Sequence, residues 1–124
     1  MKRYISAAIK DITQEDINFR YRVAWNICTD RRVLRHLAEN DPDSGVRKSA
    51  QDTLDSIAWG EDFLTKTNID PDVLDAIAMS SAVHMRYYIA LHPDTSDDTL
   101  MSLAKDSVAE VREVALSNLR SRGL

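Results

Sequence analysis

Apolar residues recur along the chain with the spacing of short amphipathic helices. Three six-residue segments, starting at Val33, Val73 and Thr99, share nearly one pattern, with apolar groups at i, i+1, i+4 and i+5. That spacing places the apolar groups on one face of a helix. A polar break rich in Asp or Ser follows each segment, and no stretch alternates apolar and polar residues as a half-buried strand does. The pattern therefore predicts an all-α fold.

A second set of segments aligns over eight columns and predicts the partner helices. These segments are 19–26, 46–53, 85–92 and 111–118. Columns one and five are always apolar, so one stripe of each helix faces a core. The step from the second to the third segment is longer than the other two by about a dozen residues. We expect this insertion, around 54–67, to lengthen the second helix up to a turn at Gly60.

Alternation of the two helix types predicts a right-handed α-α superhelix, a short α-solenoid of about four helical repeats. One helix pair cannot bury its own apolar stripe, so neighbouring pairs must cover it. We expect a single domain over 1–124, with an N-terminal capping helix over 1–12, repeats over 13–118 and a polar C-terminal end over 119–124.

Capping residues mark the predicted helix starts. Thr13, Thr29 and Thr95 precede Ile17, Val33 and Thr99, each an early position of a predicted helix, by four residues. A threonine oxygen at an N-cap accepts from a free backbone N–H. Asp70 is predicted as another N-cap, because Pro71 then occupies the first helical position, where no N–H is needed.

The stretch from His92 to Arg112 resembles the leucine-rich repeat variant (LRV) unit, which reads roughly N-P-x-T-P-x-x-L-x-x-L-A-x-D-x-x-x-x-V-R-x-x-V-A-x-N. Asn26 to Arg47 fits the same pattern less closely, and the resemblance covers most of 19–118. It implies an α-solenoid related to HEAT repeats. Some LRV proteins carry an N-terminal cysteine cluster that holds iron–sulfur. That cluster is absent from this sequence, so the resemblance implies no cofactor.

The second column of the aligned segments is always arginine. Its members are Arg20, Arg47, Arg86 and Arg112. One interpretation is an internal ladder in which each planar, permanently charged guanidinium reaches carboxylates or carbonyls of the adjacent unit. Candidate carboxylate partners are Asp30, Asp41 and Asp106. The alternative is a row of phosphate contacts.

Columns three and seven lie one helical turn apart and share a face distinct from the core stripe. If the second helices line the concave side, this face forms a groove rich in residue types that dominate binding hot spots. The predicted partner-binding residues on and beside it are Tyr21, Arg22, Trp25, Lys48, Tyr87, Tyr88 and Leu91. The alternative is that the aromatic side chains pack against a neighbouring helix.

Charge is uneven along the chain. Residues 1–50 hold 10 Lys and Arg against 7 Asp and Glu, whereas residues 51–124 hold 6 against 13. A basic cluster in the first half consists of Arg31, Arg32, Arg35, Arg47 and Lys48. It is either a solvated face or a docking site for an acidic partner or a nucleic-acid backbone.

Catalytic signals are weak. The three histidines, His36, His84 and His92, are not at metal-ligand spacing, and no glycine-rich phosphate loop is present. Cys28 has no paired histidine and is expected to be a small buried apolar group. We expect no enzyme activity, no metal and no cofactor. A single cysteine points to a reducing compartment, and neither a secretory signal nor a membrane span is predicted, so we expect a cytoplasmic protein.

Three functions fit these features. The first is a non-catalytic module that binds another protein through the face of its second helices. The second is a nucleic-acid-binding protein similar to the HEAT-like DNA glycosylases, which the acidic second half disfavours because phosphate affinity rests on cations. The third is a self-associating structural repeat, with a homodimer formed through its open ends.

Overall fold

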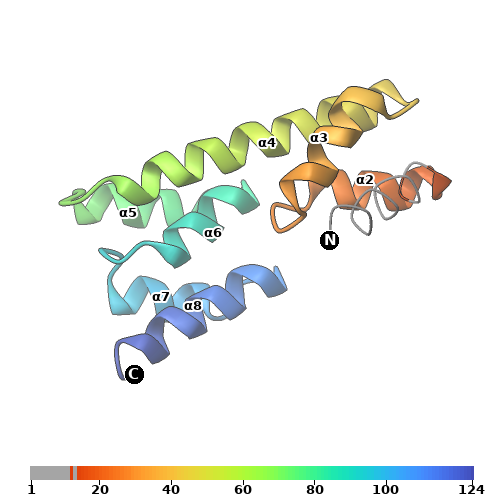
Figure 1. Ribbon diagram of the computed structural model, residues 1–124. Helices are drawn as coiled ribbons and strands as arrows, with labels where there is room; N and C mark the ends of the chain where they lie inside the picture. Colours follow the sequence, from red (N-terminus) through yellow and green to blue (C-terminus); the bar gives the residue numbers. More distant parts are fainter. Residues whose placement is uncertain (1–11, 13) are drawn as a thin grey trace. The chain divides into compact units, whose positions relative to one another are not determined.

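The computed structural model describes Ile12 and residues 14–124, and every regular element in that part of the chain is a helix (Figure 1). The helices are α2 (Ile17–Trp25), α3 (Arg31–Asn40), α4 (Ser44–Thr65), α5 (Pro71–Ala78), α6 (Val83–Leu91), α7 (Asp97–Leu103) and α8 (Ala109–Ser121). The predicted all-α fold is therefore confirmed for the described residues. The predicted capping helix over 1–12 lies outside them, apart from Ile12.

None of the helices in this part of the chain combines the length and the apolar character that crossing a membrane requires.

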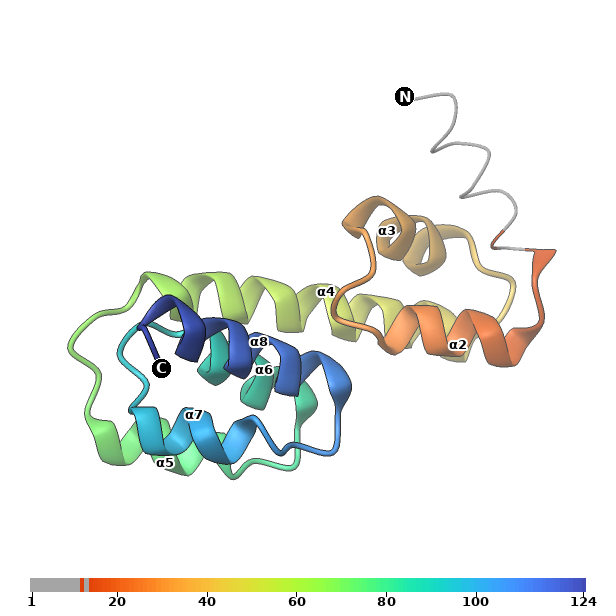
Figure 2. The ribbon, with the colours of Figure 1, turned by 90° about the horizontal axis from the view of Figure 1, so that it is seen from below.

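The chain forms two units, the first ending at Ala58 and the second beginning at Trp59. The boundary lies inside α4, so one helix supplies residues to both units. In the second unit, α5 and α7 lie in one layer while α6 and α8 lie in another (Figure 1, Figure 2). The helix α8 continues to Ser121, beyond the predicted end of the repeats at residue 118.

Side-chain caps determine where four of the helices begin. Asp16, Asp30 and Asp70 each accept a hydrogen bond from the backbone N–H two residues later, and Ser96 accepts one from Thr99 N. These oxygens satisfy donors that the first turn of a helix leaves free. The predicted cap at Asp70, with Pro71 after it, is confirmed.

The prediction of Thr29 and Thr95 as N-caps was wrong, because the caps stand one residue later in both cases. Thr29 Oγ1 donates instead to Val23 O at 2.8 Å, and Thr95 Oγ1 donates to Ile89 O at 2.7 Å. Each threonine therefore closes the end of the preceding helix, whose last carbonyls have no partner within the helix. The third predicted cap, Thr13, lies outside the described residues.

The core of the first unit is assembled from three helices. Its fully or nearly buried members are Ala24, Leu34, Leu37, Val46, Ala50 and Ile57. Val46 and Ala50 come from columns one and five of the aligned segments, and Leu34 and Leu37 come from the preceding amphipathic helix α3. On α2 the expected core stripe was wrong, because Phe19 of column one is 39% exposed and Ala24 of column six is buried instead. Each buried leucine contributes about 1.5–3 kcal/mol relative to an exposed one.

The core of the second unit is also built from apolar side chains of successive helices, and it includes residues from the end of α4. Its buried apolar side chains are Phe63, Leu74, Tyr88, Ile89, Ala90, Leu100, Leu103, Val111, Ala115 and Leu119. Trp59 of α4 stacks on Phe63 with ring centroids 5.2 Å apart and meets Tyr88 edge-on at 6.2 Å. The end of α4 therefore covers α6.

The predicted turn at Gly60 was wrong, because α4 continues through this residue to Thr65. Gly60 is buried beneath the ring of Tyr88, and a Cβ at this position would overlap that ring. The glycine is thus explained by close packing between α4 and α6. Glycine is less favourable than alanine inside a helix by about 1 kcal/mol. This cost is small beside the free energy gained by burying an aromatic side chain.

Equivalent contacts recur in the two units about 66 residues apart along the chain. Thr53 Oγ1 of α4 donates to Ala24 O of α2, and Asn118 Nδ2 of α8 donates to Ala90 O of α6. Nearer the start of these helices, Tyr21 of α2 contacts Asp43, just before α4. Contacts therefore advance along both helices in the same direction, so α2 and the first part of α4 run parallel.

Replacing Gly60 with alanine should destabilise the second unit. Overpacking a close contact costs about 1–3 kcal/mol, which exceeds the roughly 1 kcal/mol that alanine gains over glycine inside a helix. Urea unfolding of the Gly60→Ala variant would measure the difference. In a Tyr88→Ala background, which lacks the ring, the same substitution should be neutral or stabilising. A stabilising Gly60→Ala in the presence of Tyr88 would contradict this packing.

Candidate functional site

One aspartate in the first unit is held by two arginines of the predicted ladder. Arg20 Nε donates to Asp41 Oδ2 at 2.9 Å, and Arg20 Nη1 donates to Glu15 O. Arg47 Nη1 donates to the backbone carbonyl of Asp41 at 2.7 Å. Asp41 itself is 1% exposed. We call this arrangement, an aspartate bound by the arginines before and after it, an arginine–aspartate junction.

The second unit contains the equivalent junction. Arg86 binds both carboxylate oxygens of Asp106, with Nε–Oδ2 and Nη2–Oδ1 distances of 2.7 and 3.2 Å. Its Nη1 donates to the carbonyls of Ser80 and Ser81. Arg112 Nη1 donates to Asp106 O at 2.8 Å. Arg20 and Arg86 therefore reach the next helix pair, as the ladder interpretation predicted, whereas Arg47 and Arg112 bind the turn before their own helix.

Asp30, the third carboxylate named as a ladder partner, has a local role instead. It caps α3 and forms an exposed ion pair with Arg32 at 3.0 Å. The hydrogen bonds from Arg32 lower the pKa of Asp30 from 3.8 to about 2. Both carboxylate oxygens of Asp30 are occupied by Arg32 of the helix that it caps, so no arginine of the column binds it.

The junction also changes the ionisation of Asp106. Burial favours the protonated form of this carboxyl group. The hydrogen bonds from Arg86 and from Val108 N, together with the charges of Arg86 and Arg112, outweigh that effect. The pKa of Asp106 consequently lies below its usual 3.8.

Apolar and aromatic side chains form one exposed stripe on a helix of each unit. The first stripe consists of Ile17, Tyr21 and Trp25 on α2, and the second consists of Val83, Tyr87 and Leu91 on α6. Members are spaced by four residues, one helical turn, so they share a face. The tyrosines are half-buried and the other four side chains are exposed. Equivalent positions therefore stay solvent-accessible in both units.

Four of the predicted partner-binding residues belong to the first unit. Trp25 is 66% exposed, and the centroid of its ring lies 5.5 Å from that of Tyr21. The hydroxyl of Tyr21 donates to Asp43 at 2.9 Å, and this bond raises the pKa of Tyr21. Lys48 is exposed and pairs with Asp52 at 3.0 Å.

The fourth residue, Arg22, is exposed and places its guanidinium over the ring of Phe19, 5.7 Å from the centroid. Tyr21 packs against Trp25 and donates to Asp43, yet it also belongs to the exposed stripe. The prediction of a binding face and the alternative of packing inside the fold therefore both apply to this residue in part.

The other three predicted residues, in the second unit, divide differently. Leu91 is exposed and Tyr87 is half-buried, in edge-on contact with Tyr88. The assignment of Tyr88 to the binding face was wrong, because its side chain is only 6% exposed and packs over Gly60. Column four of the alignment turns inward here because the inserted residues continue α4 across α6.

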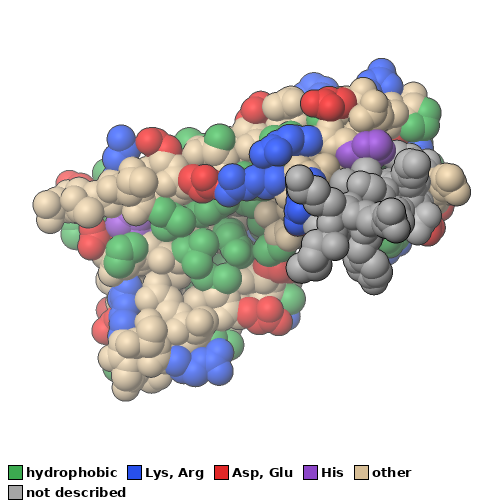
Figure 3. All heavy atoms as spheres, viewed as in Figure 1, with side chains coloured by type: hydrophobic (Ala, Val, Ile, Leu, Met, Phe, Trp, Pro, Cys, Tyr) green, Lys and Arg blue, Asp and Glu red, His purple; other side chains and the backbone are tan. Residues whose placement is uncertain are grey.

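A hollow of about 250 Å³ adjoins the second stripe. It is lined by Leu91 of α6 and by Val114, Ser117, Asn118 and Ser121 of α8. Figure 3 shows hydrophobic side chains gathered over α6 in this unit. The stripe and the hollow together form a groove between two parallel helices, which we call the α6–α8 groove.

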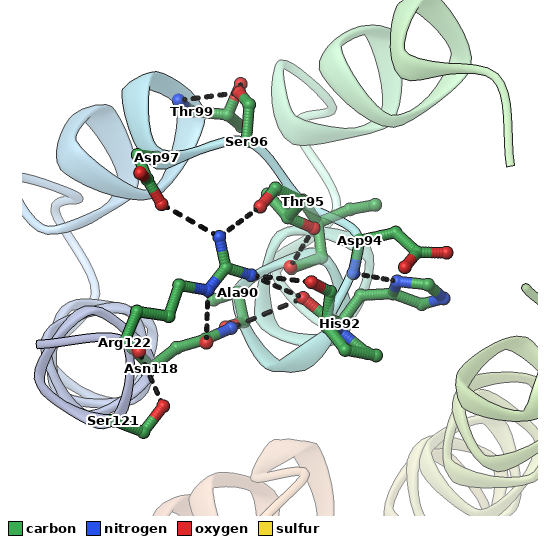
Figure 4. A network of polar contacts seen from close by, with 12 residues as sticks. Ala90, His92, Asp94, Thr95, Ser96, Asp97, Thr99, Asn118, Ser121 and Arg122 are labelled. Carbon is green, nitrogen blue, oxygen red and sulfur yellow. Dashed lines mark hydrogen bonds and ion pairs between the residues drawn. The ribbon is translucent and has the colours of Figure 1, made fainter. Parts of the chain in front are cut away.

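A polar network that the sequence did not reveal closes the turn between α6 and α7 (Figure 4). Arg122 donates to the carbonyls of Thr95 and Pro93 at 2.6 and 2.8 Å and pairs with Asp97 at 3.0 Å. The predicted polar end of the chain is thus tied to a turn about 27 residues earlier. No local pattern signals a contact over that separation.

The buried histidine of this turn is satisfied inside the fold. His92 Nδ1 accepts from Asp94 N at 3.0 Å, and Nε2 lies 2.9 Å from Lys66 O. This pattern requires the neutral imidazole with its hydrogen on Nε2. His92 therefore joins the turn after α6 to the end of α4.

In the described part of the chain, no three His, Cys, Asp or Glu side chains are placed to hold a metal ion. Burial lowers the pKa of His84, which lies edge-on to Trp59.

The expectation that Cys28 is buried was wrong, since its side chain is exposed. In the basic cluster, Arg31, Arg32, Arg35 and Lys48 are exposed and Arg47 is half-buried.

Compared with protein-family models, curated proteins and solved structures, the chain shows no significant match. The resemblance to the LRV unit therefore stays a prediction, and the functional argument rests on the geometry of the two units.

Breaking the junction in the first unit should cost far more than breaking a surface pair. Replacing Asp41 with alanine leaves Arg20 buried without its carboxylate, which costs about 3–5 kcal/mol. Asp52→Ala removes the exposed pair with Lys48 and should cost about 0.5 kcal/mol or less. Urea unfolding of both variants would test this, and equal losses would contradict a structural role for the junction.

Stability should fall on acidification. The pKa values of Asp30, Asp43 and Asp106 are all lowered in the folded protein. A carboxylate of this kind stabilises the fold fully above about pH 5, and its contribution is lost as the pH falls through the folded pKa. We therefore expect the free energy of unfolding to decrease from about pH 5 towards pH 2. Asp106→Asn should reduce this pH dependence; Asp98→Asn, an exposed control, should not.

Proposed function

We propose that this protein is a small right-handed α-solenoid of the LRV/HEAT-like kind. The support is the recurrence of one arginine–aspartate junction in both units and the parallel course of the second helices. The aspartate and the Val-Arg pair of the LRV pattern correspond to Asp106, Val111 and Arg112. Arg112 binds Asp106, and Val111 is fully buried. The resemblance thus coincides with residues that hold two helix pairs together.

We further propose that the protein is a non-catalytic module that binds another protein through its two exposed stripes. The observation that carries this proposal is their recurrence: α2 and α6 leave apolar side chains exposed at equivalent positions. Trp and Tyr are enriched among the residues that dominate protein interfaces, and hydrophobic anchors commonly occupy the centre of such surfaces.

The arginine column favours a protein partner over a nucleic acid. Each of its guanidinium groups donates to a carboxylate or a backbone carbonyl within its own unit. A phosphate contact would have to displace these partners, which for Arg20 means leaving the buried carboxylate of Asp41 unpaired. The net charge of −4 also opposes binding to a polyanion.

Capture of the natural partner should depend on the stripes. The immobilised full-length protein would be compared with a Trp25→Ser/Leu91→Ser variant in extracts of the source cells. Both side chains are exposed, so the fold should persist, which circular dichroism would check. We expect about a tenfold or greater loss of the captured protein, the usual effect of losing a hot spot.

The matched control for this experiment is Met79→Ser. Met79 is 87% exposed but lies just after α5, outside both stripes. Its replacement should leave capture unchanged. Undiminished capture by the Trp25→Ser/Leu91→Ser variant would contradict binding through the stripes. Recovery of the same chain as the captured protein would indicate self-association.

A further inference from the structure

The α6–α8 groove has charged side chains along one side. Glu110 and Glu113 precede Val114 and Ser117 by four residues on α8, so each pair lies on one side of that helix. Glu113 is exposed and Glu110 is half-buried. Among the ion pairs of the described residues, neither glutamate takes part. The groove therefore combines an apolar stripe on α6 with two carboxylates on α8 that lack a cationic partner.

The equivalent surface of the first unit is electrically compensated. The positions that correspond to Glu110 and Glu113 are occupied there by Gly45 and Lys48. Lys48 is paired with Asp52, which corresponds to Ser117 of the groove. The uncompensated charge is thus a property of the second unit, whose residues 59–124 hold 11 Asp and Glu against 6 Lys and Arg.

We infer that the α6–α8 groove binds a basic amphipathic helix of a partner protein. Apolar side chains of that helix would contact the stripe on α6, and one of them would enter the hollow beside Leu91. Lysine or arginine side chains on its flank would face Glu110 and Glu113. This inference rests on the proposed function and assigns the chemistry of the partner for one of the two stripes.

The shape of the groove favours a helix over other ligands. The regular elements of the described residues are all helices, so they offer no strand edge to which an extended peptide could add. Members of the stripe are four residues apart, about 6 Å along the axis, which matches apolar residues spaced along one face of a partner helix. A hollow of about 250 Å³ is below the roughly 300–1,000 Å³ of small-molecule sites.

Charge should decide which helix binds. Carboxylates at the edge of an apolar surface raise the association rate of a cationic partner and exclude an anionic one. Because Glu113 is exposed, this preference should weaken as salt screens it. The apolar contacts with Val83, Tyr87 and Leu91 should persist at high salt.

Two synthetic helical peptides would test the inference on the full-length protein. Both are about 18 residues long, with leucines at i, i+3 and i+4; one carries lysine at its polar positions and the other carries glutamate. A scrambled leucine–lysine peptide controls for non-specific attraction. Fluorescence anisotropy at about 50 and 200 mM salt should show the basic helix binding at least tenfold more tightly than the other two at low salt.

Variants would locate the binding on the groove. Glu110→Gln/Glu113→Gln should weaken the basic peptide by about tenfold and reduce its salt dependence. The matched control is Asp72→Asn/Asp98→Asn, which removes two exposed carboxylates from α5 and α7, the other layer of the same unit. It changes the net charge equally and should leave the affinity within about twofold of the unmodified protein.

Equal affinity for the basic and acidic peptides would overturn the inference, as would equal effects of the two double variants. Failure of both peptides to bind, with the natural partner still lost in the Trp25→Ser/Leu91→Ser variant, would remove the inference and leave the proposed function standing. If the basic peptide bound selectively to the groove but capture of the natural partner did not depend on the stripes, the inference would stand and the proposed function would be contradicted.

Discussion

An aspartate in the turn before a second helix is bound by two arginines, and the packing of each unit depends on that contact. In the first unit the carboxylate of Asp41 accepts from Arg20 and from Asp43 N, while its carbonyl accepts from Arg47. Sliding α4 along α2 would leave this buried carboxylate without a cation, at a cost of several kcal/mol. The junction therefore specifies one register between consecutive helix pairs, whereas apolar contacts alone tolerate several.

That register determines which side chains remain outside the core. On α2 the buried residues, Arg20 and Ala24, belong to columns two and six, and on α6 columns four to six are buried. The residues one turn apart on the opposite side of these two helices form the exposed stripes. Thr29 and Thr95 close the helices that carry the stripes, because each donates to a carbonyl of the last turn. The same polar contacts thus position equivalent surfaces in both units, and sequence differences at Lys48 and Glu113 then give those surfaces different charge.

Periodicity was enough to predict helices, the arginine column and two of its carboxylate partners, because these features repeat along the chain. The predictions that failed concern residues whose positions depend on single contacts that do not repeat along the chain. Asp30 is satisfied by its own helix, and Gly60 stays helical because the ring of Tyr88 packs against it. Tyr88 is buried because the inserted residues continue α4 over α6, and Arg122 reaches carbonyls far away in sequence. These contacts depend on three-dimensional packing, so residue type and spacing did not predict them.

Double-mutant cycles at the two junctions test the central claim most directly. The pairs are Arg20 with Asp41 and Arg86 with Asp106, each truncated singly and together, with the free energy of unfolding measured in urea at neutral pH. Hydrogen-bonded partners in direct contact, buried at the first junction and half-buried at the second, should give a coupling energy of about 1.5–3 kcal/mol at both junctions. A coupling below about 0.5 kcal/mol at either one, the value typical of an exposed ion pair, would contradict the account.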